Sequence, residues 1–281
     1  MSDSLPTKYV ERGLITGIPR SGTTLCCYLL NQQDNVIALH EPINPNQVDF
    51  TSNTLEHISA KYMEYSKALY NGSEFEHGDQ AGLEIDNPVG LKEVEGKREV
   101  TAKRGNIKVS KYIGQDIQLF VKQNAFFTAY FPLLSAHFNI TCIVRNPVDV
   151  LLSWWTVNLP VSRGRLPAGE NNNAHLKQAL SLQNDEFQRQ LIIYQWFAKT
   201  YFLSNASIIC YEDIIKTNGQ ALFTATNVVQ TNPQKLEMKT RSYSADILLK
   251  LKDLQQSIIQ LDCQGLYSQE DISKRIEQLL G

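Results

Sequence analysis

Short apolar runs alternate with longer amphipathic stretches along most of the chain, which is typical of a parallel α/β fold. The apolar runs predict strands at residues 10–16, 36–40, 117–122, 140–145 and 206–210. The amphipathic stretches predict helices at residues 22–33, 54–70, 128–137, 147–157, 175–204, 217–228, 243–259 and 268–280. The clearest helical period covers 175–204, where apolar side chains from Leu176 to Phe202 recur on one face. We therefore expect a central parallel sheet flanked by helices.

Two segments depart from this alternation. Residues 71–111 are rich in glycine and charge, and residues 158–174 are rich in glycine, proline and asparagine. We interpret the first as an irregular segment that contributes to substrate binding, and the second as a surface loop or lid. No internal repeat is visible in the sequence. The length suits one large α/β domain or two small ones, and we expect residues 1–281 to form a single domain.

Composition narrows the class of protein. The chain has 281 residues, of which 42% are hydrophobic, and a formal net charge of −2, so it lacks the basic footprint of a nucleic-acid-binding protein. Its five cysteines show no C-x2-C spacing, which indicates reduced core residues rather than metal ligands or disulfides. Residues 1–8 do not resemble a signal peptide, and no run of about 18 apolar residues occurs. We expect a cytoplasmic protein with neither membrane nor nucleic-acid partners; its oligomeric state is not readable.

The most informative segment is Gly17-Ile-Pro-Arg-Ser-Gly-Thr-Thr-Leu25, between the first strand and the first helix. The spacing of its glycines is that of a phosphate-binding loop, and a helix that begins at Gly22 points free N–H groups towards the loop. ATP-binding loops of this kind carry a lysine where this chain has Thr23. Arg20 is the only basic residue inside the loop, which favours a phosphorylated ligand other than ATP.

A second anion site is predicted at Arg145-Asn-Pro-Val-Asp-Val-Leu-Leu-Ser153. Arg145 follows a buried strand, Pro147 suits the first turn of a helix, and Ser153 lies two turns into that helix. On this arrangement Arg145 and Ser153 grip one phosphate together. The alternative is that Arg145 only caps the strand and that Ser153 only packs inside the helix.

The two segments together resemble motifs of the sulfotransferases that use 3′-phosphoadenosine-5′-phosphosulfate (PAPS), in particular the bacterial small-molecule type. The first corresponds to Pro19-Arg-Ser-Gly-Thr-Thr24 and the second to Arg145–Ser153, in the family's order; Cys210-Tyr-Glu-Asp-Ile-Ile215 resembles a third element. The resemblance covers roughly residues 10–225. It implies a P-loop three-layer fold and transfer of a sulfuryl group from PAPS to a hydroxyl or amine of a small-molecule acceptor, without a metal.

The resemblance also implies a set of site residues. Those expected to bind PAPS are Pro19, Arg20, Ser21, Gly22, Thr23, Thr24, Arg145, Ser153 and Tyr211. The late R-K-G element of the commonest cytosolic branch is absent here, and Arg241 is a separate candidate for a late cation at the 3′-phosphate. Tyr211 is expected to contact adenine, with Trp154 and Trp155 as alternatives.

Catalysis requires a base for the acceptor and cations for the leaving phosphate. Glu41, which follows the strand Val36–Leu39, is at the position where related sulfotransferases carry a glutamate base, and His40 is the rival base. Lys122, at the end of another strand, and Arg20 are expected to stabilise the transferred group and the leaving phosphate.

The acceptor is not identified by these motifs. Seven acidic residues and only Lys92 as a base lie between Glu74 and Glu95, which favours a cationic metabolite over a neutral acceptor, unless this segment is simply a solvated loop. Two other functions stay open: a P-loop kinase that uses ATP, and a non-catalytic nucleotide-binding relative of the sulfotransferases.

Overall fold

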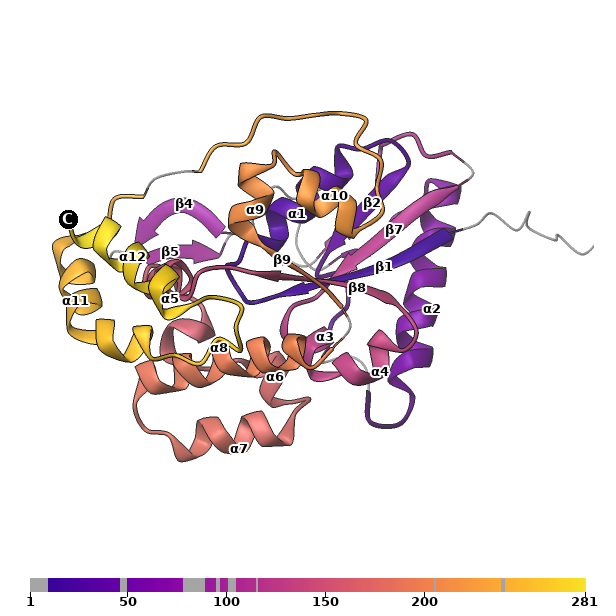
Figure 1. The fold of residues 1–281 in the computed structure, drawn as a ribbon. Coiled ribbons are helices and arrows are strands. Elements are labelled where there is room, and N and C mark those ends of the chain that lie inside the picture. Colours follow the sequence, from indigo (N-terminus) through magenta and orange to yellow (C-terminus); the bar gives the residue numbers. More distant parts are fainter. Residues whose placement is uncertain are drawn as a thin grey trace, which may run out of the picture.

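The computed structural model describes residues 10–45, 50–77, 89–94, 97–100, 105–114, 116–204, 206–238 and 241–281. Its centre is a sheet of five parallel strands (Figure 1). In spatial order these are β2 (Val36–His40), β7 (Ile117–Lys122), β1 (Val10–Gly17), β8 (Asn139–Val144) and β9 (Ser207–Cys210). All five lie within one residue of the predicted strands, so the α/β fold with a parallel sheet is confirmed.

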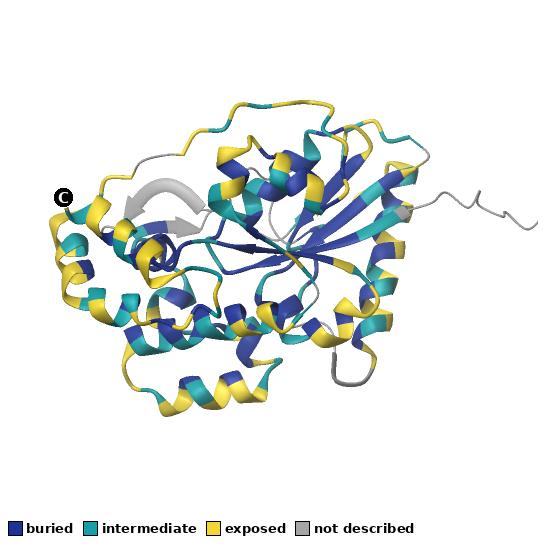
Figure 2. Cartoon of the chain, viewed as in Figure 1, coloured by how far each residue is buried: buried dark blue, intermediate teal, exposed yellow. Residues whose placement is uncertain are grey.

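The strands are buried on both faces because their side chains alternate between two cores (Figure 2). Leu14 of β1 faces one core and Ile15 the other, and Cys142 and Ile143 of β8 divide in the same way. Nearly continuous apolar runs are therefore required, which is why the sequence marked these strands clearly.

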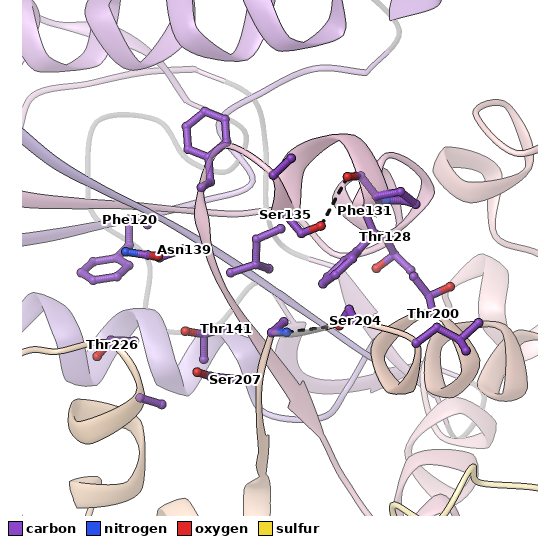
Figure 3. Close-up of a pocket in the computed structure, with 18 of the residues that line it drawn as sticks. Phe120, Thr128, Phe131, Ser135, Asn139, Thr141, Thr200, Ser204, Ser207 and Thr226 are labelled. Carbon is purple, nitrogen blue, oxygen red and sulfur yellow. Dashed lines mark hydrogen bonds between the residues drawn. The ribbon is translucent and has the colours of Figure 1, made fainter.

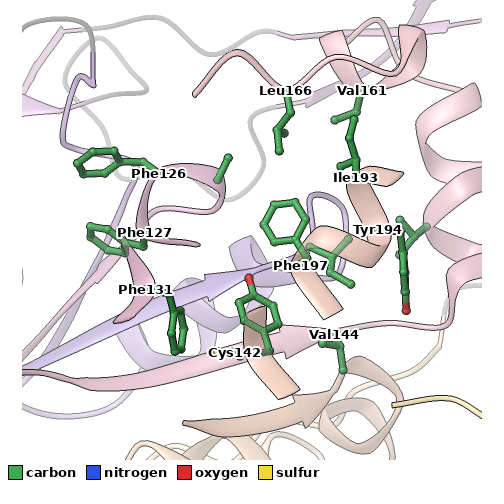
Figure 4. Packing of buried hydrophobic residues seen from close by; sticks show 14 of the residues in the cluster. Phe126, Phe127, Phe131, Cys142, Val144, Val161, Leu166, Ile193, Tyr194 and Phe197 are labelled. Atoms are coloured by element: carbon green, nitrogen blue, oxygen red, sulfur yellow. The ribbon is translucent and has the colours of Figure 1, made fainter. Parts of the chain in front are cut away.

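Three helices cover one face of the sheet: α1 (Thr23–Asn31), α9 (Tyr211–Lys216) and α10 (Gln220–Ala225). The opposite face packs against α2 (Phe50–Asn71), α3 (Ala125–Ala129), α4 (Phe131–Ser135) and α8 (Glu186–Phe202). Aromatic side chains fill this second core, where Phe126, Phe127, Phe131 and Phe197 lie between the strands and the helices (Figure 4).

The helix predicted over 175–204 is wrong in one respect, because it is two helices. Helix α7 (Ala174–Leu182) ends before Gln183, whose backbone is extended. Asp185 then begins α8 by accepting a hydrogen bond from the backbone N–H of Gln188 at 2.7 Å. Phe202, expected on the buried face, is 56% exposed.

The helix predicted over 128–137 is also divided, into α3 and α4. Pro132 lies in the first turn of α4, where its missing N–H costs nothing, but it cannot continue a helix from α3.

The segment 158–174 is more ordered than a loop, which corrects our first interpretation. It contains a 3₁₀ turn η1 (Pro160–Arg163) and helix α6 (Pro167–Glu170). Val161 and Leu166 are buried in the aromatic core, and the carboxylate of Glu170 accepts the backbone N–H of Leu166.

Segment 71–111 is only partly described. Its described parts form two antiparallel pairs, β3 (Phe75–His77) with β6 (Gly105–Ile107) and β4 (Val89–Val94) with β5 (Lys97–Val100). The backbone of Arg98 in β5 also bonds to Thr156 and Asn158, just beyond helix α5 (Pro147–Trp155). The hairpin β4–β5 is therefore attached beside the carboxyl ends of the strands.

The chain ends in two helices, α11 (Ala245–Ile259) and α12 (Gln269–Leu280), which pack against each other and against α5. Among the helices that the structure describes, none is long and apolar enough to cross a membrane. All five cysteines are free; Cys26, Cys27, Cys142 and Cys263 are buried, and Cys210 is half-buried. That residues 1–281 form one domain stays a prediction.

Candidate active site

The predicted site residues follow the carboxyl ends of four neighbouring strands. Glu41 comes after β2, Lys122 ends β7, the glycine loop follows β1, and Arg145 follows β8. Because the strands are parallel, these ends meet at one edge of the sheet, where α/β proteins bind ligands. Residues separated by more than a hundred positions are thereby brought together.

The loop after β1 needs its two glycines for different reasons. A Cβ atom on Gly17 would lie 2.6 Å from the carbonyl oxygen of Ile143, which is backbone. Gly22 has φ +93° and begins helix α1, and a Cβ atom there would lie 2.4 Å from the ring of Tyr211. Arg20 also has a positive φ of 73°, a conformation that stores backbone strain.

Buried hydrogen bonds hold the loop against β8 and α5. The N–H of Ile18 and the hydroxyl of Ser21 both donate to the carbonyl of Ile143, at 3.1 and 2.9 Å. The indole N–H of Trp154 donates to the carbonyl of Pro19 at 2.8 Å. The Ser21 side chain therefore holds the loop against β8. Thr23 is buried and Thr24 half-buried, both at the start of α1.

The two predicted anion motifs meet at Ser153. The Nε of Arg20 donates to the hydroxyl of Ser153 at 3.1 Å, and the Nη1 of Arg145 lies 3.5 Å from the carbonyl oxygen of Arg20. Ser153 is almost fully buried in α5, so its hydroxyl faces the loop rather than solvent. Arg20 therefore links the two motifs, and a joint grip of Arg145 and Ser153 on one phosphate stays a prediction.

Positive charge accumulates at this cluster. Burial, and then the neighbouring charges of Arg98, Arg241 and Arg145, together lower the pKa of Arg20 to about 10. Gathering like charges in a partly buried place is unfavourable unless an anion binds between them. Arg98, in hairpin β4–β5, was missed from the sequence because no motif surrounds it.

Tyr211 lies where β9 passes into α9, against Gly22. The guanidinium carbon of Arg145 lies 4.5 Å from the centre of the Tyr211 ring, within cation–π range. Trp154 and Trp155, the alternatives for contact with adenine, are both buried, and the indole N–H of Trp155 donates to Gln190. Neither indole is free to stack on a ligand, so Tyr211 is the aromatic residue that remains.

Glu41 and Lys122 form an ion pair at the ends of β2 and β7. The Nζ of Lys122 lies 2.5 Å from Oε1 of Glu41, and the backbone N–H of Glu41 donates to the carbonyl of Lys122 at 2.8 Å. Lys122 is only 2% exposed, whereas the Glu41 side chain is 42% exposed. Glu41 also has a positive φ of 51°, a second strained position at this edge.

His40, the rival base, is buried beside the same pair. Burial lowers its pKa to about 3, and the nearby charge of Lys122 contributes in the same direction. A histidine with such a pKa is a weak proton acceptor near neutral pH. Between the two candidates, the geometry favours the exposed carboxylate of Glu41.

Two further residues contact the site from the C-terminal helices and were also missed from the sequence. Arg275 of α12 donates to both oxygens of Asp149, from Nε at 2.9 Å and from Nη2 at 2.8 Å. Tyr267, just before α12, donates to Glu212 at 2.7 Å. Their partners, Asp149 and Glu212, belong to the sequence motifs. Arg275 and Tyr267 lie more than 50 positions further along the chain, where no motif marks them.

A cavity of about 880 Å³ lies elsewhere, at the opposite edge of the sheet (Figure 3). Its lining includes Asn139 and Ser207, the first residues of β8 and β9, together with Phe131 and Thr200. None of the predicted site residues lines it. The chemistry suggested by the motifs therefore belongs to the carboxyl edge and not to this cavity.

Most of the acidic segment falls outside the described residues: Asp79, Glu84, Asp86 and Glu95 are not described, nor is the side chain of Glu93. Within the described part of the chain, no group of three or more His, Cys, Asp or Glu residues is arranged to hold a metal ion.

The fold and the site together define a P-loop α/β protein with two linked anion-binding elements. The sequence model of the sulfotransferase domain matches residues 11–217, which is most of the chain, and the chain belongs to the sulfotransferase family. It is therefore a transferase of the class that uses PAPS. The motif-based assignment to this family is confirmed.

A sulfotransferase from Alicyclobacillus acidocaldarius is among the solved structures that are similar to this chain. The two chains share 13% sequence identity over 96% of this chain and 95% of that chain, with a TM-score of 0.42. A search of curated proteins returned no match.

Proposed function

We propose that this protein transfers the sulfuryl group of PAPS to a hydroxyl or amine of a small-molecule acceptor, in the cytoplasm. The observation that carries the proposal is that Arg20 and Arg145 come together from two different strand ends, with Arg20 bonded to the hydroxyl of Ser153 and Arg145 beside the carbonyl oxygen of Arg20. A cluster of arginines around Arg20 suits a ligand with two separate phosphate groups, and PAPS has one at each side of its ribose.

The donor is bound by both motifs. The N-terminal turn of α1, with Thr23 and Thr24, receives the 5′-phosphosulfate, where free N–H groups and the helix dipole favour an anion. Arg145 and Ser153 bind the 3′-phosphate. Tyr211 contacts adenine, and Arg241, exposed beside the cluster, adds a cation to the 3′-phosphate side.

The chemical step needs no covalent intermediate with the protein. The acceptor oxygen or nitrogen forms a bond to sulfur while the bond between sulfur and the 5′-phosphate oxygen breaks. The acceptor proton passes to the carboxylate of Glu41, and 3′-phosphoadenosine-5′-phosphate (PAP) leaves with the electron pair of the broken bond. Glu41 is the base because its side chain is exposed to an incoming acceptor.

Lys122 and Arg20 stabilise the charge that develops on the leaving phosphate. Lys122 is anchored by burial next to the loop, since β7 pairs directly with β1. In the free protein its ammonium group is paired with Glu41, and an arriving sulfuryl group offers it a second anionic partner. The ammonium group is then shared between the base and the transferred group.

The acceptor is proposed to be cationic, because seven acids lie between Glu74 and Glu95. Replacing Glu84, Asp86 and Glu93 with their amides should raise KM for the acceptor without changing KM for PAPS. An unchanged KM for the true acceptor would contradict this part of the proposal.

The decisive experiment is calorimetric binding of PAP compared with Mg-ATP, for the wild-type protein and for Arg145→Ala. We expect tight binding of PAP that Arg145→Ala weakens at least tenfold, and little binding of Mg-ATP. Preference for Mg-ATP would instead support the kinase alternative. Binding of PAP without turnover by any acceptor would support a non-catalytic relative.

A further inference from the structure

The C-terminal helix α12 holds a buried carboxylate of the second anion motif. Arg275 makes two hydrogen bonds to Asp149, at 2.9 and 2.8 Å, in the paired geometry that is strongest for arginine and a carboxylate. The Asp149 side chain is only 7% exposed. These hydrogen bonds raise the pKa of Arg275, so its charge is firmly held.

Asp149 has a second cation within reach. The Nη2 of Arg145 lies 3.8 Å from the same Oδ1 that accepts from Arg275. At this distance Arg145 is attracted to Asp149 without a direct hydrogen bond. Its guanidinium lies instead over the ring of Tyr211, beside the loop that contains Arg20.

The backbone beside Arg145 is held from the C-terminal segment as well. Tyr267 donates to Oε2 of Glu212, while Oε1 of the same carboxylate accepts the N–H of Asn146 at 3.1 Å. The carbonyl of Arg145 accepts the hydroxyl of Tyr194 at 2.8 Å. Because the carbonyl of Arg145 and the N–H of Asn146 are both hydrogen-bonded, we expect Arg145 to move through its side-chain torsions and not through its backbone.

We propose that Arg275 is a positioning residue that keeps Arg145 available for the 3′-phosphate by satisfying Asp149 in its place. Without Arg275, the nearly buried carboxylate of Asp149 has Arg145 as its nearest cation. Leaving such a carboxylate unpaired is costly, so Arg145 closes the gap to Asp149 and turns away from the ligand.

This inference rests on the proposed function, since it assigns the Arg145 side to the 3′-phosphate. It goes beyond the family match, which ends at residue 217, whereas Arg275 lies in the last helix. The apolar residues Ile272 and Ile276 account for the packing of α12, and Arg275 adds a charged contact that packing alone does not require.

The test compares two probes that differ only in the 3′-phosphate, PAP and adenosine 5′-monophosphate (AMP). Calorimetry gives the ratio of their affinities, which reports on the 3′-phosphate subsite alone. We expect Arg275→Met to lower this ratio at least tenfold while AMP binds as before. A loss that came only from loosened packing would weaken both probes and leave the ratio unchanged.

A rescue variant tests whether Asp149 is the group that draws Arg145 away from the ligand. Asp149→Asn combined with Arg275→Met removes the carboxylate that competes for Arg145, so the ratio should return to within about threefold of wild type. The matched control is Lys274→Met, at the neighbouring exposed position of α12, where the ion pair with Glu270 is on the surface. It should leave the ratio unchanged.

The outcomes separate the two proposals. A wild-type protein that does not prefer PAP over AMP overturns the proposed donor site, and this inference with it. A wild-type preference that Arg275→Met retains overturns the role of Arg275 alone, as does a double variant that loses more selectivity than the single one. If Arg275→Met does not fold, Arg275→Lys, which keeps the charge but not the paired geometry, should still lower the ratio three- to tenfold.

Discussion

The ammonium group of Lys122 lies 2.5 Å from the carboxylate of Glu41, and the two residues are also joined through their backbones. Lys122 is buried, so its charge needs a partner, while Glu41 is open to solvent on one side. The pair brings the best-placed base and a cation to the same strand ends. Because Glu41 and Lys122 are paired, a change in either side chain alters the electrostatic environment of the other. We therefore expect effects on donor binding and on turnover that can be measured separately.

Replacing Glu41 with glutamine should remove turnover while leaving donor binding largely intact. The amide keeps the shape of the side chain but accepts no proton, so the rate should fall about 10²- to 10⁴-fold. PAP affinity, measured by calorimetry, should stay within about threefold of wild type. Glu64→Gln on α2, where the ion pair with Lys61 is partly exposed, is the matched control for both measurements. Retained turnover in Glu41→Gln would show that another group is the base.

Replacing Arg98 with methionine should weaken donor binding, because Arg98 is one of the cations around Arg20. Methionine retains much of the buried length of the side chain, so the change mainly removes charge. We expect PAP affinity to fall about tenfold, as for loss of a charge-assisted hydrogen bond. Lys97→Met, at the adjacent position of β5, should change it less than twofold. Equal effects of the two variants would mean that only the general charge of the hairpin matters.

The five strands were predictable because each must be apolar on both faces, and such runs stand out from the amphipathic helices between them. The glycine loop and the arginine motif were predictable because their residues are close together in sequence. The helix boundaries at Asp185 and Pro132 were missed. A continuous run of apolar positions hid both the N-cap at Asp185 and the break before Pro132.

The rest of the site depends on contacts between distant parts of the chain. Arg98 reaches the loop only because its backbone pairs with residues beyond α5, and Arg275 reaches Asp149 across 126 positions. Trp154 and Trp155 were alternatives to Tyr211 for contact with adenine, but the packing of α5 buries both. Local pattern therefore predicts motifs, whereas tertiary packing decides which side chains those motifs can use.

Substitutions of glycine in the loop should separate crowding from backbone strain. Gly22→Ala places a Cβ atom against the Tyr211 ring and also requires a left-handed backbone, whereas Gly265→Ala, at φ +75°, has no heavy atom within 4 Å of the new Cβ atom. Gly265→Ala should therefore cost only about 1–2 kcal/mol of unfolding free energy. Gly22→Ala should cost more and also weaken PAP binding, because Tyr211 must move. Chemical denaturation and calorimetry give the two quantities, and equal stability losses would exclude the contact with Tyr211.

The buried histidine beside the ion pair should make the protein less stable in acid. His40 has a pKa of about 3 in the folded protein, lowered chiefly by burial and then by Lys122, while an unfolded histidine has a pKa of about 6.5. The unfolded state therefore binds a proton that the folded state excludes. The stability from this residue is fully present above pH 6.5 and is lost as the pH falls towards 3, by up to about 1.4 kcal/mol per pH unit.

In His40→Gln this contribution disappears, so the stability curve from denaturation at successive pH values should be flatter between pH 6.5 and 3 than that of wild type. His137→Gln, on the exposed surface, should leave the slope unchanged. Parallel curves for wild type and His40→Gln would mean that the pKa of His40 in the folded protein is close to its unfolded value. In that case the reason for preferring Glu41 over His40 as the base would be lost, because a histidine that titrates normally beside Lys122 would regain its claim to the acceptor proton.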